Sequence, residues 1–67
     1  MGTLYDYCAR IEEHIERENL DIFRTRGELA LRAGFLISLV SPEDPDDSEK
    51  IMALRDAASE VLGLQLS

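Results

Sequence analysis

Residues 29–40 read Leu-Ala-Leu-Arg-Ala-Gly-Phe-Leu-Ile-Ser-Leu-Val and form the most apolar stretch of the chain. If this stretch is a helix, with about 100° between successive residues, its apolar side chains surround the whole axis. Leu31, Phe35 and Leu39 then fall on the side opposite Leu29. A helix that is apolar on all sides is typical of an element covered from more than one direction. We therefore expect this stretch to be the centre of the fold.

The apolar stretch continues a helical pattern that begins near Ile22, directly after Asp21, a residue type that caps helix N-termini. A strand over residues 34–40 is the alternative, because a short apolar run is ambiguous by periodicity alone. Helix is favoured because no turn signal precedes the run and the combined pattern is too long for a strand. The sequence predicts a second helix over residues 22–40, with Gly34 inside it.

Amphipathic patterns flank this central segment on both sides. Residues 4–18 follow Thr3, a suitable N-cap, and repeat apolar side chains at helical spacing. Residues 41–47 read Ser-Pro-Glu-Asp-Pro-Asp-Asp, an acidic loop that ends in helix-capping residues. A third helix is predicted over residues 47–62, before Gly63. The expected fold class is all-α: one domain over residues 1–67, a helical hairpin plus an N-terminal helix, completed to a larger bundle by self-association.

The chain is short and acidic, which restricts its partners. It has 67 residues, with seven Lys and Arg against fourteen Asp and Glu, and a formal charge of -7. A domain of this size removes only about 60% of its surface from water, so its core is small. The negative charge disfavours nucleic acid and anionic membranes as partners, because both attract cations. Residues 21–40 hold three basic and two acidic side chains and are the only part with a positive balance.

The single cysteine, Cys8, indicates a reducing environment, because a small secreted chain usually depends on several disulfides. The first residues carry neither a basic segment nor an apolar stretch of signal length. The longest apolar run is far shorter than the roughly 20 residues of a membrane-spanning helix. We expect a cytoplasmic protein without a membrane segment.

The residues that carry chemistry do not form a known catalytic or metal-binding pattern. His14 is the only histidine, so an enzyme or phosphorelay function would have to use it. Asp44, Asp46 and Ser48 match the first three ligand positions of a calcium-binding loop, but Glu49 replaces the required glycine. We expect no catalytic residues, no metal and no cofactor.

Residues 28–34 read Glu-Leu-Ala-Leu-Arg-Ala-Gly and are followed by Phe35 and, later, Val40. This pattern resembles the first helix, the turn and the second-helix anchor of helix-turn-helix DNA-binding proteins. The resemblance implies that Gly34 forms the turn and that residues 36–39 begin a recognition helix. Those residues include no Arg, Lys, Gln or Asn to contact a base or a phosphate. A degenerate helix-turn-helix regulator is therefore the alternative, and nucleic acid is not the expected partner.

Two amphipathic helices of one chain cover at most two sides of the central helix, so part of its apolar surface is left over. An apolar patch of that kind marks an interface. Small side chains on the same helix allow a neighbouring helix to approach closely. The predicted interface residues are Gly27, Ala30, Leu31, Gly34, Phe35 and Leu39.

We expect a homodimer or higher homo-oligomer that acts as a small non-catalytic interaction or regulatory module. A further alternative is an acidic, inhibitor-like or antitoxin-like partner of a basic protein.

Overall fold

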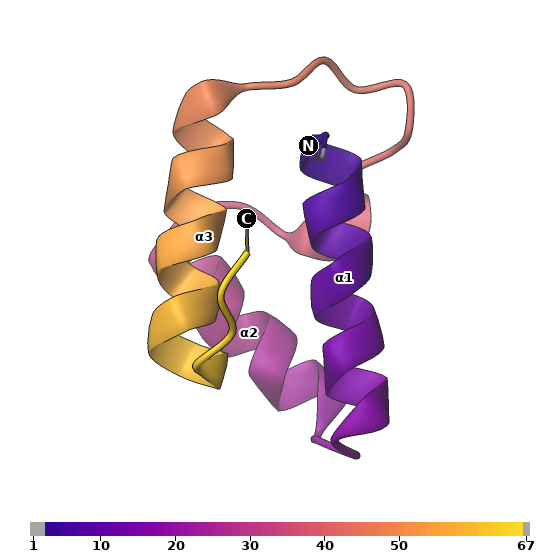
Figure 1. The fold of residues 1–67 in the computed structure, drawn as a ribbon, viewed down its shortest axis with the longest axis vertical. Helices are drawn as coiled ribbons and strands as arrows, with labels where there is room; N and C mark the ends of the chain where they lie inside the picture. Colours follow the sequence, from indigo (N-terminus) through magenta and orange to yellow (C-terminus); the bar gives the residue numbers. More distant parts are fainter. Residues whose placement is uncertain (1–2, 67) are drawn as a thin grey trace.

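The computed structural model describes residues 3–66, which form three α-helices and one short 3-10 helix (Figure 1). The α-helices are α1 (Leu4–Arg17), α2 (Ile22–Ala33) and α3 (Ser48–Leu62), and the 3-10 helix is η1 (Ile37–Leu39). The residues described include no strand. The all-α, three-helix prediction is confirmed.

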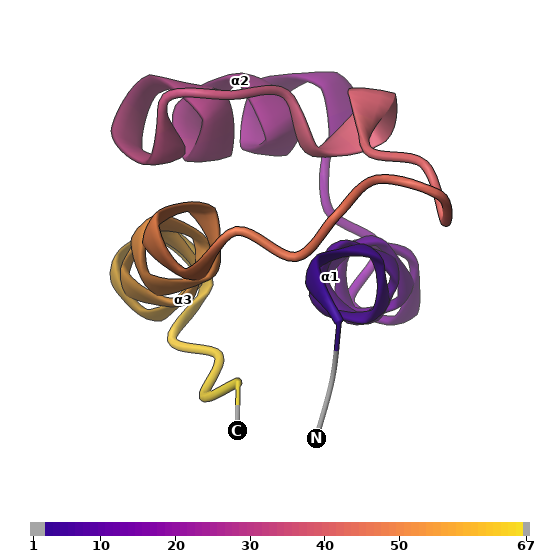
Figure 2. The same cartoon turned by 90° about the horizontal axis from the view of Figure 1, so that it is seen from above.

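The helices form two layers (Figures 1 and 2). In one layer α1 and α3 lie side by side and run in the same direction, and α2 crosses over both in the other layer. The chain after α3 turns back on the side away from α2, and Leu66 is only 4% exposed there. This end of the chain is packed onto the bundle.

The core lies where the two layers meet. The apolar face of α1 is buried there, in one cluster with Leu29 of α2 and Leu54 of α3, which are both fully buried. The buried apolar residues are Leu4, Tyr7, Cys8, Ile11, Ile15, Leu29, Ile37, Leu54, Ala57, Ala58 and Leu66. No buried side-chain nitrogen or oxygen among the described residues lacks a hydrogen-bond partner.

The end of α2 differs from the sequence prediction. The helix stops at Ala33 because Gly34 adopts a left-handed conformation (φ 85°), and the Gly34 amide donates to the carbonyl oxygen of Ala30 at 2.8 Å. Glycine takes this conformation without the steric penalty that other residues incur. The predicted second helix does begin at Ile22, but its predicted end at residue 40 is wrong, as is the placement of Gly34 inside it.

Beyond Gly34 the chain bends at Phe35 and passes through the extended residue Leu36 into η1, which places Ile37 in the core with 3% of its surface exposed. The apolar stretch of residues 29–40 is divided between the end of α2 and η1. Each of these two elements buries only some of its apolar side chains, on different sides, which explains why the stretch is apolar all round. Gly34 does end a helix, as the helix-turn-helix resemblance implies. However, the next element is a three-residue 3-10 helix, so the expected recognition helix is absent from residues 35–40.

The carboxylates of the acidic loop accept hydrogen bonds from backbone amides of α1, of α3 and of the loop itself. The Asp46 carboxylate accepts a hydrogen bond from the amide of Leu4 at 2.9 Å, across 42 positions of sequence, and so caps the start of α1. Asp47, one of the capping residues at the end of the loop, accepts hydrogen bonds from the amides of Glu49 and Lys50 and so caps α3. Asp44 accepts from the amide of Ser41 at 3.0 Å within the loop. These aspartates satisfy backbone donors that would otherwise lack partners.

Candidate interaction site

The most exposed apolar side chains on a helix of this protein lie on one face of α2. Phe23 is 81% exposed and Leu31 is 83% exposed. Gly27 lies midway between them, four residues from each, and a Cβ atom built on it would have no atom within 4 Å. Because α2 is the outer layer of the bundle, none of residues 3–66 covers this surface (Figure 2). We call Phe23, Gly27 and Leu31 the outer face of α2.

The predicted interface residues are divided between this face and other surroundings. Gly27 and Leu31 belong to the outer face, and Ala30 lies beside them, half-buried. Gly34 is exposed at the helix end. Leu39 is 74% exposed but lies on η1, so it does not share a helix with Leu31.

Among the large predicted interface residues, Phe35 is the one that the rest of the chain covers best. It is half-buried against the core, and the Lys50 ammonium lies 5.5 Å from the centre of its ring. A cation at this position is attracted by the electron-rich face of the ring. Phe35 therefore has a role within the monomer, and a polar substitution there would disturb the fold.

Phe23 was not among the predicted interface residues, although the sequence carries a signal for it. Phe23, Gly27 and Leu31 follow one another at intervals of four, so they share one face of a helix. The all-round apolar stretch begins only at Leu29, so Phe23, in the first turn of α2, lies outside it.

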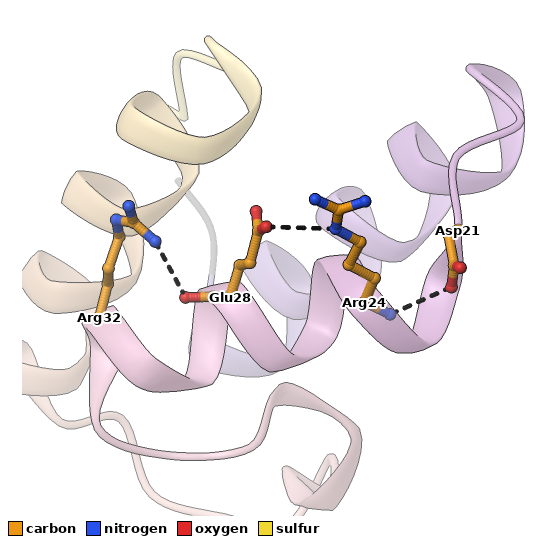
Figure 3. A network of polar contacts seen from close by, with 4 residues as sticks. All are labelled: Asp21, Arg24, Glu28 and Arg32. Atoms are coloured by element: carbon orange, nitrogen blue, oxygen red, sulfur yellow. Dashed lines mark hydrogen bonds and ion pairs between the residues drawn. The ribbon is translucent and has the colours of Figure 1, made fainter.

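A row of charged residues borders the outer face of α2 (Figure 3). The Arg24 guanidinium lies 3.6 Å from the Glu28 carboxylate, and its amide donates to Asp21 at 3.1 Å. Arg32 donates to the backbone carbonyl of Glu28 at 3.5 Å. The Arg32 guanidinium forms its ion pair with Glu60 of α3, at 3.2 Å, and not with the Glu28 carboxylate of its own helix. The row alternates in charge and is solvent-exposed.

A groove of about 650 Å³ lies between α1 and residues 37–42. Its apolar lining includes Ala9 and Val40, and Glu13 and Glu16 line its acidic part. Arg26 of α2 also reaches the groove.

Arg26 binds Glu12 through two parallel hydrogen bonds. Its Nε and Nη2 atoms donate to the two carboxylate oxygens of Glu12 at 2.9 and 2.8 Å. The side-chain hydrogen bond to Glu12 is the largest cause that raises the pKa of Arg26. This pair joins α2 to α1.

Cys8 and His14 lie in different surroundings. Cys8 is 3% exposed, and burial, with a smaller contribution from the Glu12 charge, raises the pKa of its thiol to about 11. The thiol therefore stays protonated near neutral pH and is a weak nucleophile. His14 is half-buried and lines a small depression with Arg10 and Arg17.

Within residues 3–66 no group of three or more His, Cys, Asp and Glu side chains is placed to hold a metal ion. Over the same range, none of the helices combines the length and the apolar character needed to cross a bilayer.

No family model, curated protein or solved structure matches the chain.

Proposed function

We propose that this chain is a small, non-catalytic interaction or regulatory module that self-associates through the outer face of α2. The observation that carries the proposal is the pair Phe23 and Leu31, each more than four-fifths exposed, on either side of Gly27. Large apolar side chains with this exposure on one helix face are typical of a protein interface. A cytoplasmic location is part of the proposal, since a lone cysteine fits a reducing compartment.

The spacing along α2 favours a second copy as the partner. Phe23 and Leu31 lie four residues before and after Gly27. If two copies of α2 pack antiparallel about a two-fold axis beside Gly27, Phe23 of one copy lies opposite Leu31 of the other. Such an interface is self-complementary, as a two-fold dimer requires. The missing side chain of Gly27 lets the two helices approach closely where they cross.

The charged row bordering the outer face agrees with this arrangement. A two-fold axis across antiparallel helices brings the same flank of both copies together. Arg24 of one copy then lies within one helical turn of Glu28 of the other, because the offset is two residues and the rise is about 1.5 Å each. Within one chain this pair is loosely held, at 3.6 Å, so both side chains are available to a second copy.

The effect of removing Leu31 from this interface follows from its exposure. Fully burying a leucine side chain contributes about 1.5–3 kcal/mol. Leu31 is 83% exposed, and a two-fold dimer buries two copies of it. Replacing it by lysine then costs roughly 2.5–5 kcal/mol, which corresponds to about 50-fold weaker association or more.

Sedimentation equilibrium tests the proposal. We expect the wild-type chain to exceed its monomer mass of 7.6 kDa as concentration rises, and Leu31→Lys to stay monomeric over the same range. Met52→Lys is the matched control, because Met52 is 64% exposed on α3, away from the outer face of α2. Circular dichroism checks that each variant is folded. A wild-type chain that stays monomeric up to about 1 mM, or a control that dissociates equally, would contradict the proposal.

A further inference from the structure

We propose that the groove between α1 and residues 37–42 binds a cationic amphipathic segment of another protein. The groove is separate from the outer face of α2, so this inference does not depend on self-association. It rests on the shape of the groove, on the chemistry of its lining and on the state of the single arginine that reaches it.

The lining has an apolar part and an acidic part along the same helix. Tyr5, Ala9, Glu13 and Glu16 lie along about three turns of α1 and all line the groove. Tyr5 is 40% exposed, so part of its ring remains available for contact. At a rise of about 1.5 Å per residue, this wall is about 17 Å long, which matches a partner helix of about three turns.

The opposite wall supplies further apolar surface. Val40 and Pro42 line it, and the exposed Ser38 adds a hydroxyl group. A bound segment would therefore place its apolar side chains between Ala9 and Val40. A helix that binds in an apolar groove uses side chains spaced three and four residues apart.

The groove carries a net negative charge, because Arg26, the one cationic residue among residues 3–66 that lines it, is already paired with Glu12. Both nitrogens that Arg26 directs toward Glu12 are used in the paired hydrogen bonds at 2.8 and 2.9 Å. Glu13 forms an exposed ion pair with Arg17. Within residues 3–66 no hydrogen bond or ion pair engages the Glu16 carboxylate. A lysine or arginine of the partner is therefore attracted to the Glu16 end of the groove.

The charge of the whole chain acts in the same direction. A formal charge of -7 raises the encounter rate with a basic partner and lowers it with an acidic one. The partner chemistry is thus a helical segment with apolar side chains on one face and Lys or Arg on the other.

The probe for this test is a synthetic helical peptide of leucine and lysine, labelled for fluorescence anisotropy. A second peptide keeps the leucines and replaces every lysine by glutamine. We expect the lysine peptide to bind the wild-type protein and the glutamine peptide to bind at least about tenfold more weakly. Equal binding of the two peptides, or no binding of the lysine peptide, would overturn the inference.

Variants of the groove separate specific docking from general charge attraction. We expect Glu16→Lys to weaken binding of the lysine peptide about fivefold or more, since it converts an attraction into a repulsion. Ala9→Gln adds bulk to the apolar part at an exposed helix position and should also weaken binding. Asp56→Lys is the matched control: it changes the net charge equally, at an exposed site on α3 outside the groove. An equal loss with Asp56→Lys would contradict docking in the groove.

The two proposed surfaces are distinguished with the same variants. Leu31→Lys should leave peptide binding unchanged, and Glu16→Lys should leave the sedimentation behaviour unchanged. Loss of both properties with either variant would show that the surfaces are not independent and would contradict the inference as stated.

Discussion

The glycine inside α2, Gly27, and the glycine that ends it, Gly34, should respond in opposite directions to the same substitution. Gly27 lies inside the helix with room for a Cβ atom and does not have a positive φ angle. Replacing a helix-interior glycine by alanine stabilises the folded chain by about 0.5–1 kcal/mol. Gly34 also has space, but its φ angle is 85°. Alanine there should cost about 1–2 kcal/mol, because a side chain disfavours the left-handed conformation.

These changes are large for a chain of this size. At about 0.05–0.15 kcal/mol per residue, 67 residues give a stability of roughly 3–10 kcal/mol. A change of 1 kcal/mol shifts the melting temperature of such a domain by about 4–8 °C. We therefore expect Gly27→Ala to melt roughly 2–8 °C higher than wild type and Gly34→Ala roughly 4–16 °C lower.

Thermal unfolding followed by circular dichroism, at a concentration where the chain is monomeric, measures both shifts. The same Gly27→Ala variant should associate more weakly, because two added methyl groups meet where the helices cross. If Gly34→Ala is neutral or stabilising, α2 continues past Ala33 and the structural account of residues 34–40 is wrong. If Gly27→Ala strengthens association, close approach at Gly27 is refuted.

Three further predictions concern the loop, the thiol and nucleic acid. Asp46→Ala removes the acceptor of the Leu4 amide and should lower the free energy of unfolding in urea by about 0.5–2 kcal/mol; an unchanged midpoint would contradict this capping role. Burial raises the pKa of the Cys8 thiol from 9.0 in the unfolded chain to about 11 in the folded chain. The stability that the protonated thiol contributes is therefore complete below about pH 9 and is lost as pH rises toward 11. Urea midpoints should fall over that pH range in wild type and fall less in Cys8→Ala. A gel shift with duplex DNA at low salt should show no complex, and a salt-sensitive complex would favour the helix-turn-helix alternative.

Helix starts and the third helix were predictable because their signals are local. Thr3 and Asp21 accept hydrogen bonds from backbone amides in the first turns of α1 and α2. Gly63 ends α3 with a left-handed φ of 65°, as predicted. In each case one side chain, or its absence, decides the backbone conformation, and neighbouring residues suffice to recognise it.

The segment after Ala33 was not predictable from local signals. Gly34 is compatible with a helix interior and with a helix end, and the choice depends on what Ile37 contacts. In the folded chain the extended route places Ile37 in the core, where it is 3% exposed, at the expense of exposing Leu39. Burying Ile37 while exposing Leu39 is a result of tertiary packing, which here overrides the helical pattern of the sequence.

The candidate surfaces were predictable only in part for the same reason. The excess of apolar surface near Leu31 follows from the small number of elements in a short chain, and the structure leaves Leu31 exposed. The groove is assembled from α1, Arg26 and residues 37–42, which lie far apart in the sequence. Its existence depends on the path of the chain after Gly34, which the sequence pattern did not reveal.

Mixing two complementary variants tests the central claim most directly. Phe23→Lys and Leu31→Glu each place a charge against an apolar side chain in the proposed antiparallel dimer, so each alone should sediment as a 7.6 kDa monomer. In a mixture, Lys at position 23 of one chain faces Glu at position 31 of the other, while the native Phe23 and Leu31 face each other at the second contact. We predict that the equimolar mixture has twice the monomer mass at concentrations where each variant alone does not. A mixture that remains monomeric, while wild type associates, would contradict the proposed pairing of Phe23 with Leu31.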